Sequence, residues 1–130
     1  DSTGANLTRL NTEHNLKIEP VFLPLSKRIS YIADDQLWVC DYNGQNLQKI
    51  TDLYSGVSGV EWSFDEKKII FVSSVYPECE TQDCIKERDE QGSKSLVKAK
   101  IFTELMYRHW NNWRGEKRSH LFHYNLDTKQ

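Results

Sequence analysis

The sequence predicts an all-β protein: a partial β-propeller of about two blades, each of four antiparallel strands, with a partly helical insertion. Two observations support this fold class. Similar segments recur at a constant offset, and each unit holds several short runs rich in β-branched and aromatic residues, separated by turn residues. An isolated four-stranded sheet has two faces to bury, and it buries them against neighbouring sheets, as propeller blades do.

The repeat is clearest in two segments that share the pattern Asp-x-x-Gly-x-Asn-Leu, residues 1–10 and 41–50. We call the step from position 1 to position 41 the repeat offset. At the same offset, Phe22 corresponds to Trp62. The alignment therefore keeps its phase without a gap across two unlike segments. The competing interpretation is that two unrelated hairpins happen to look alike.

The correspondence extends into the expected strand cores. Residues 29–32 (Ile-Ser-Tyr-Ile) match residues 69–72 (Ile-Ile-Phe-Val). A third, partial copy at 119–124 resembles 36–40, but it lies just over twice the repeat offset further along the chain. The excess indicates an insertion in the second unit.

Within each unit the composition favours strands over helices, because β-branched and aromatic side chains fit a pleated surface. Asn43 and Gly44 are expected to supply the positive backbone angles that a tight hairpin turn needs. Strands are expected at 18–22, 28–33, 36–41, 46–50, 57–62, 67–73 and 119–125.

The expected strands divide the chain into segments of a single domain. Residues 1–10 are expected to form the last strand of a preceding blade, 18–50 a full blade, and 57–130 an incomplete blade with an insertion at 74–118. Propellers close with about four to eight blades, so these units cannot form a ring alone. We therefore expect 1–130 to be a fragment of one β-propeller domain, whose open blade edges favour self-association.

Charge and composition argue against several partners. Seventeen basic and nineteen acidic side chains leave a formal net charge of −2, whereas nucleic-acid binding needs a strongly positive face. No apolar run is long enough for a membrane-spanning helix, and residues 1–4 lack the charged-then-apolar order of a secretory signal. No nucleic-acid partner and no membrane partner is expected.

Two of the three cysteines, Cys79 and Cys84, lie five positions apart, which permits a local disulfide and favours an oxidising compartment. With His109, His120 and His123 they also make a thiol and imidazole set of the kind that zinc accepts. On the expected strand, however, His120 and His123 are three positions apart and point to opposite faces. A Cys79–Cys84 disulfide is therefore expected, and no metal site.

Residues Gly59–Ser73 resemble the "WSPDGKKIAFVS" repeat of TolB-type propellers, with Phe64 and Glu66 in place of the usual Pro and Gly. The preceding segments 36–41 and 44–51 look like the partner motif of that repeat. This resemblance implies a fold and leaves function open, because the repeat occurs in many proteins.

The insertion gives a more specific resemblance. Its segments 76–79, 98–101, 105–113 and 117–122, with Cys84 between the first two, resemble the propeller insertion of bacterial dipeptidyl peptidases in the prolyl oligopeptidase family. The resemblance implies a periplasmic or secreted serine peptidase. In that family the propeller screens peptides for an α/β-hydrolase domain, which is absent from this chain. The alternative function is a TolB-type scaffold that binds a protein partner.

No catalytic residue is expected among these residues. A nucleophile elbow needs a Gly two positions to either side of the Ser. The nearest match, Gly56–Val60, has Val60 where the second Gly belongs, and it is better read as a turn before a strand. No cofactor is expected either.

The candidate substrate-binding residues are Arg108, His109, Trp110 and Trp113, which combine a fixed positive charge, an imidazole and two large rings within six positions. Such a set suits a peptide, whose carbonyls and carboxylate it can bind and whose side chains it can stack against. The structural alternative is that the rings pack the insertion onto the blade while Arg108 pairs with Glu104.

The insertion is expected to contain a helix within Lys94–Tyr107, because Val97, Ile101 and Leu105 recur at helical spacing. The preceding residues 87–93 are polar and unpatterned, and we expect them to be mobile.

Several remaining residues have simpler expected roles. Cys40 is expected to be a small buried apolar residue. The resemblance implies that a propeller carboxylate holds the free amine of the substrate, but the spacing selects none of Glu78, Glu80 and Glu104. Acids at hairpin turns are expected to satisfy local backbone groups: Asp34, Asp35, Asp65 and Glu66.

Overall fold

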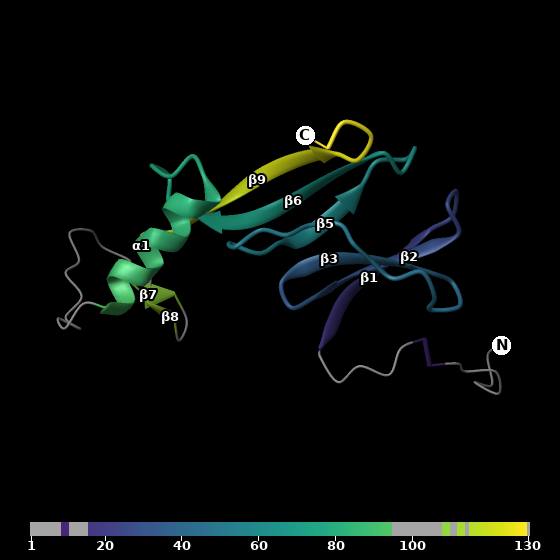
Figure 1. Cartoon of the computed structure of the whole chain (residues 1–130), viewed down its shortest axis with the longest axis horizontal. Coiled ribbons are helices and arrows are strands. Elements are labelled where there is room, and N and C mark those ends of the chain that lie inside the picture. The colour runs from purple at the N-terminus through teal and green to yellow at the C-terminus, as the bar shows by residue number, and fades with distance from the viewer. Residues whose placement is uncertain (1–8, 11–15, 95–107, 110–111, 114, 130) are drawn as a thin grey trace.

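The computed structural model describes residues 9–10, 16–94, 108–109, 112–113 and 115–129, with the backbone alone for 108–109 and 112–113. The protein is mostly β, with one helix among the described residues (Figure 1). The elements in chain order are β1 (Lys17–Leu23), β2 (Arg28–Ala33), β3 (Gln36–Asp41), β4 (Gln48–Lys49), β5 (Ser58–Trp62), β6 (Lys68–Val75), α1 (Gln82–Lys94), β7 (Arg108–His109), β8 (Asn112–Trp113) and β9 (Arg118–Asn125).

The strands form two main antiparallel sheets. The four-stranded sheet has the order β1-β2-β3-β4, the three-stranded sheet has the order β5-β6-β9, and β7 and β8 make a separate ladder. The two main sheets lie one over the other in Figure 1 and do not close into a ring. β6 and β9 are consecutive in the sheet although α1 and the β7–β8 ladder lie between them in the chain, so the insertion enters at one end of this sheet.

The two sheets share one pairing register. In the first hairpin Phe22 pairs with Ile29, and in the second Trp62 pairs with Ile69. Both first strands also have a register shift at the same place, between Ile18 and Val21 in β1 and between Ser58 and Glu61 in β5. The repeat offset read from the sequence is thus also the offset between the two hairpins.

The third strands correspond in the same way. Ile29 of β2 pairs with Cys40 of β3, and Ile69 of β6 pairs with Tyr124 of β9. β9 therefore takes the place of β3 in the second sheet, with Tyr124 at the position of Cys40.

The main core lies between the two sheets and is built from one face of each. Its buried members are Ile32, Leu37, Val57, Val60, Ile69 and Phe71. The other face of the four-stranded sheet forms a second cluster of Ile29, Tyr31, Ala33 and Cys40. Because successive side chains of a strand alternate between faces, β2 contributes to both clusters and is buried on both sides.

Leu10 and Ile50 are one repeat offset apart in the sequence, yet they pack against different clusters. Leu10 packs against the second cluster, and Ile50 packs against the main core. Leu10 also passes very close to Gly44, which has a positive φ of 81°. A Cβ at this position would lie 2.0 Å from the Leu10 carbonyl oxygen, so the approach requires glycine.

The fourth strand is shorter than expected, Gln48–Lys49 instead of 46–50. The ladder ends early because the Leu37 N–H donates to the Thr51 side-chain hydroxyl at 2.9 Å, where a longer strand would offer a backbone carbonyl. At the other end Asn46 has a positive φ of 52°, which breaks the extended backbone.

The expectation that residues 87–93 are mobile was wrong, because they lie in α1. The Thr81 hydroxyl accepts a hydrogen bond from the Cys84 N–H at 3.2 Å and so caps the start of this helix. Ile85 is its buried residue, with 1% exposure. The helix is otherwise polar, which is why hydrophobic periodicity did not reveal it. The expected helix within Lys94–Tyr107 lies outside the described residues, apart from Lys94.

No helix within the described ranges has both the length and the apolar character that crossing a membrane requires.

Candidate functional site

Three of the four candidate substrate-binding residues lie in the β7–β8 ladder, at the same end of the molecule as α1 (Figure 1). Arg108 pairs with Trp113, and His109 pairs with Asn112. The ladder thus places the backbones of Arg108 and Trp113 directly opposite each other. Trp110 lies outside the described residues, as does Glu104, the acid expected to pair with Arg108 in the structural alternative.

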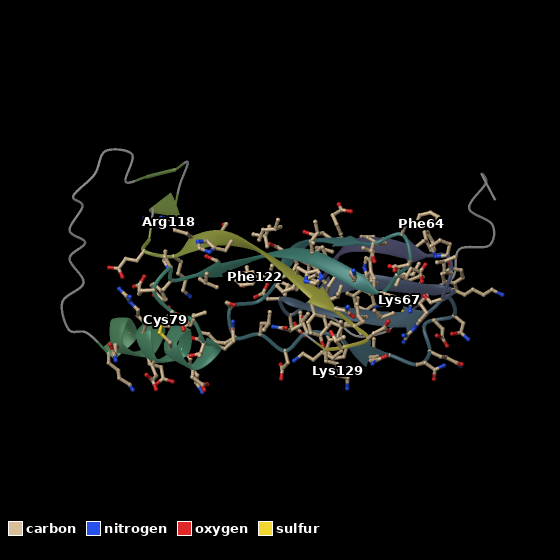
Figure 2. The ribbon with its side chains drawn as sticks, turned by 90° about the horizontal axis from the view of Figure 1, so that it is seen from above. Phe64, Lys67, Cys79, Arg118, Phe122 and Lys129 are labelled. Atoms are coloured by element: carbon tan, nitrogen blue, oxygen red, sulfur yellow. A yellow bond between two sulfur atoms is a disulfide. The ribbon has the colours of Figure 1, made fainter. Side chains whose placement is uncertain are left out.

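The insertion begins with a disulfide between Cys79 and Cys84, whose Cα atoms are 5.5 Å apart. The Cys79 N–H donates to the Tyr76 carbonyl at 2.9 Å, so a turn after β6 carries the first cysteine. Cys84 lies in the first turn of α1. The bridge, visible beside the labelled Cys79 in Figure 2, therefore ties the exit from β6 to the start of the helix.

A second connection, which we call the clasp, consists of Tyr76, Arg88, Asp89 and Lys117. The Tyr76 hydroxyl donates to Asp89 Oδ1 at 2.8 Å, and Lys117 Nζ donates to Asp89 Oδ2 at 2.6 Å. Both cations also lie against the tyrosine ring, with Arg88 Cζ 4.6 Å and Lys117 Nζ 5.3 Å from its centroid. The clasp joins the residue after β6, the middle of α1 and the residue before β9.

The environment of the clasp shifts two of its pKa values. Burial, together with the hydrogen bond and the charge of Asp89, raises the pKa of Tyr76 to about 12. Burial by itself would raise the pKa of Asp89, but hydrogen bonds from Lys117 and Tyr76 outweigh it and lower that pKa below its ordinary value. At neutral pH the clasp is therefore a neutral phenol, a carboxylate and two cations.

Arg88 extends the clasp to two further acids. Its guanidinium forms ion pairs with Glu78 and with Glu116, the latter at 2.8 Å between Nη2 and Oε2. Glu78, one of the three carboxylates considered for holding a substrate amine, is thus already paired. Sequence reasoning missed the roles of Arg88 and Asp89, because they lie in the polar run 87–93. The sequence signal that could have located this helix is Thr81, a residue type that caps helix N-termini.

A cavity of about 340 Å³ lies next to the insertion, between the segment that follows β4 and the three-stranded sheet. The rings of Phe71 and Phe122 stack beside it, with centroids 5.7 Å apart. Gln82, the first residue of α1, accepts a hydrogen bond from the Ser55 N–H at 3.1 Å and connects this region to the insertion. The cavity is lined by Ile50, Thr51, Asp52, Leu53, Phe71, Ser73, Gln82, Phe122, His123 and Tyr124.

The near match to a nucleophile elbow occupies the turn before β5 and the start of that strand. Ser58 is the first residue of β5, and its hydroxyl donates to the Val72 carbonyl at 3.4 Å. An elbow requires a strand, a sharp turn and then a helix, and β5 instead follows directly.

His120 and His123 lie on β9 and pair with Ser73 and Ile70, so they point to opposite faces as expected. Among the described residues, no three His, Cys, Asp or Glu side chains converge as a metal site would require. Cys40 is free and buried, with 3% exposure, and burial raises the pKa of its thiol. It is the buried apolar residue that the sequence indicated.

The hairpin acids divide into two groups. Asp34 and Asp35 both adopt positive φ in the β2–β3 turn, and Asp65 accepts hydrogen bonds from the Ser63 hydroxyl and the Lys67 N–H within its own turn. Glu66 does not have the local role that the sequence predicts. Its carboxylate accepts hydrogen bonds at 2.7 and 2.9 Å from two N–H groups of the other hairpin, those of Leu25 and Ser26.

These observations define a class of protein segment: two open antiparallel sheets with corresponding registers and an insertion fastened by a disulfide and a clasp. No protein-family model matches the chain. It is similar to "Dipeptidyl-peptidase 5" of Porphyromonas endodontalis, at 23% identity over 117 residues that cover 87% of this chain and 16% of that protein. To "Dipeptidyl-peptidase 5" of Porphyromonas gingivalis it is 28% identical over 107 residues, which cover 79% of this chain and 15% of that protein.

The chain therefore spans about one sixth of the length of the curated relatives it matches. At this level of identity the likeness indicates a peptidase-related segment.

Proposed function

We propose that this chain is part of the β-propeller of a dipeptidyl peptidase or related serine oligopeptidase, and that it helps to admit and recognise peptide substrates. The observation that carries the proposal is the similarity to the two dipeptidyl peptidases, which extends over 87% of the chain in the longer match. Hydrolysis would take place in an α/β-hydrolase domain outside these residues. The segment itself is proposed to be non-catalytic and to need no cofactor.

The arrangement of the sheets supports the propeller part of the proposal. Two antiparallel sheets repeat one register at the repeat offset and bury a shared core between their faces. Stacking of this kind is how blades obtain their stability from their neighbours. A ring of such blades would admit extended peptides and exclude folded proteins by size.

The insertion supplies the recognition part. The ladder sets Arg108 opposite Trp113, and the disulfide and the clasp fasten the segments on either side of the insertion. Arg108, His109, Trp110 and Trp113 are proposed to contact the peptide. A periplasmic or secreted location is part of the same proposal, since a disulfide persists in an oxidising compartment.

Kinetics of a complete peptidase that contains this segment test the recognition role. Arg108→Ala or Trp113→Ala should raise KM for oligopeptides by about tenfold and leave kcat nearly unchanged, because binding contacts are lost while the reacting groups are not. Lys94→Ala, at the exposed end of α1, is the matched control and should leave both constants unchanged. Unaltered KM in both insertion variants would remove the recognition role. Turnover of a chromogenic dipeptide by the 130-residue chain alone would contradict its non-catalytic character.

One observation favours the alternative, a TolB-type scaffold that binds a protein partner. The outer face of the three-stranded sheet exposes two large apolar side chains, Leu121 at 69% and Ile70 at 42%. Such a surface suits a partner, but in a propeller it would face the next blade. A gene product that ends with the propeller and contains no hydrolase domain would favour the scaffold.

A further inference from the structure

The segment between β4 and β5, residues 50–57, connects the two main sheets, and we call it the crossover. It is fastened to the four-stranded sheet. The buried Gln36 side chain donates to the Leu53 carbonyl at 2.7 Å and accepts from the Leu53 N–H at 3.0 Å. Further along, the Val57 N–H donates to the Asp35 carbonyl at 2.8 Å. Because Asp35 and Gln36 lie where β2 turns into β3, the crossover follows the position of the four-stranded sheet.

Gln82, the first residue of α1, binds the middle of the crossover. Its Oε1 atom accepts hydrogen bonds from the Ser55 N–H at 3.1 Å and from the Ser55 hydroxyl at 3.2 Å. A backbone N–H can only donate, so the side-chain atom that faces it must be an acceptor. In the described part of the chain the amide nitrogen of Gln82 has no acceptor of its own. The contact therefore uses Gln82 as an acceptor alone.

The backbone beside Ser55 is held in place by close packing. The Ser73 hydroxyl of β6, 3% exposed, lies 2.7 Å from Ser55 Oγ and 2.6 Å from the Gly56 carbonyl oxygen. Gly56 has a positive φ of 69°, and a Cβ at this position would lie 2.8 Å from the Cβ of Asp35. Ser55 therefore offers α1 a fixed pair of donors.

Two contacts join α1 to the crossover. Besides the contact between Gln82 and Ser55, the Tyr54 hydroxyl donates a hydrogen bond to Asp89. Gln82, Ile85 and Asp89 recur at a spacing of three and four, so they share one face of the helix. Ile85 is 1% exposed, which identifies this face as the one packed on the protein. The disulfide and the rest of the clasp lead instead to the exit from β6 and to the return toward β9.

α1 in turn holds the end of the insertion. Arg88 pairs with Glu116 at 2.8 Å, and Asp89 accepts a hydrogen bond from Lys117 at 2.6 Å. Lys117 lies four residues after Trp113 in the chain, and four residues span at most about 14 Å. The orientation of α1 therefore limits where the β7–β8 ladder can lie.

We propose that Gln82 is a positioning residue for peptide recognition. As the hydrogen-bond acceptor for Ser55 it sets the tilt of α1 against the four-stranded sheet, and the clasp carries that setting to the β7–β8 ladder. This role rests on the proposed recognition function of the insertion. Gln82 acts through α1 and makes no contact with the substrate itself.

Three variants isolate the acceptor. Gln82→Ala removes it, whereas Gln82→Glu keeps an acceptor on a side chain of the same length. Alanine is a better helix former than glutamine, and a glutamate in the first turn is favoured by the helix dipole, so neither substitution weakens α1 itself. Gln91→Ala is the matched control, because Gln91 is an exposed glutamine of the same helix.

Residual dipolar couplings of the isotope-labelled 130-residue protein measure the orientation of α1 relative to β2 and β3. The three elements should fit one alignment tensor in the unaltered protein, in Gln82→Glu and in Gln91→Ala. In Gln82→Ala the couplings of α1 should depart from that tensor, and the Ser55 amide should exchange about fivefold faster because it loses one hydrogen bond. Slow exchange in β2 and β3 shows that the variant is folded. A Gln82→Ala helix that still fits the common tensor would overturn the proposal.

Kinetics of a complete peptidase that contains this segment test the effect on recognition. Gln82→Ala should raise KM for oligopeptides about fivefold with kcat nearly unchanged, and Gln82→Glu should restore the original KM. A role in stability alone would reduce the amount of active enzyme, and so the apparent kcat, without raising KM. Equal rises in KM for Gln82→Ala and Gln82→Glu would overturn the acceptor role.

The positioning role and the recognition role fail in different ways. If Arg108→Ala raises KM and Gln82→Ala does not, the recognition role stands and the positioning role is overturned. If neither variant raises KM although the couplings of α1 change in Gln82→Ala, the recognition role fails. Gln82 then orients a helix that takes no part in peptide binding.

Discussion

Glu19 and Gly59 occupy the same position in successive hairpins and are joined by a hydrogen bond: the Glu19 carboxylate accepts the Gly59 N–H at 2.8 Å. Both residues lie at the register shift of their strand and both have positive φ, 52° and 58°. The bulge of one sheet is thus held by a side chain from the equivalent bulge of the other. Because Gly59 has no side chain, the three-stranded sheet cannot repeat this contact with a further sheet.

Glu19→Ala should lower the free energy of unfolding by about 1 kcal/mol, because the Gly59 N–H loses a charged acceptor but remains accessible to water. Urea denaturation followed by tryptophan fluorescence measures the change. Glu61→Ala, which replaces an exposed glutamate of β5, the strand that contains Gly59, should be nearly neutral. Equal effects of the two substitutions would show that the carboxylate at Glu19 does not hold the sheets together.

Leu37→Ala and Leu121→Ala test the burial difference at one equivalent position. Leu37 is 1% exposed in the main core, so its truncation should cost about 2–4 kcal/mol. Leu121 is 69% exposed, and its truncation should change stability by less than about 0.5 kcal/mol. A large loss at Leu121 in the monomer would mean that another part of the chain already covers the β9 edge.

The clasp should give the stability of α1 a pH dependence. The pKa of Asp89 is lowered in the folded state, so its contribution is present above the unfolded pKa, ordinarily about 3.8, and is lost as pH falls through the folded value. Helix content from circular dichroism should therefore fall at acid pH. Asp89→Asn should weaken this dependence, whereas an unchanged acid transition in that variant would assign it to other carboxylates.

Tyr76 should ionise at a higher pH than an ordinary tyrosine. Its pKa of about 12 lies above the ordinary value of 10, so its neutral form stabilises the clasp fully below pH 10, and that stabilisation is lost as pH rises toward 12. Ultraviolet titration of the phenolate, compared with a Tyr76→Phe variant, isolates this group. The variant should lack the late step; if the step remains, the late group is another tyrosine.

The Cys79–Cys84 disulfide should stabilise the start of α1 by about 2 kcal/mol, the entropy lost from a short closed loop in the unfolded chain. The double variant Cys79→Ser with Cys84→Ser should increase hydrogen exchange in the first turns of the helix. The amides of β2 and β3 should stay protected, since those strands lie in the other sheet. Uniform loss of protection across both sheets would contradict a local role.

The local sequence pattern was sufficient to predict the two hairpins. The alternating burial in β6 follows directly from the side-chain period of two. Every second residue of this strand is buried: Ile69, Phe71, Ser73 and Val75. The pairing of Trp62 with Ile69 likewise reproduces that of Phe22 with Ile29 because both depend on short-range turns. Helix α1 escaped notice because its single deeply buried residue, Ile85, creates no periodic pattern.

The candidate site was less accessible to sequence reasoning. Arg108 and Trp113 were singled out by residue type, and the ladder that pairs them was not expected. The clasp joins Tyr76 to Lys117 across the whole insertion, and no local pattern relates residues that far apart in sequence.

The sequence by itself determined the strand periodicity, the repeat offset and the proximity of Cys79 to Cys84, because each depends on interactions between near neighbours in the chain. Only the tertiary structure decided that Glu66 binds the turn of the other hairpin, that Glu78 is paired with Arg88, and that β9 has a free edge among the described strands. The physical reason is that a charged side chain or a strand edge takes whichever partner folding brings within hydrogen-bonding distance. That partner is set by how the two sheets stack and by where the chain returns from its insertion.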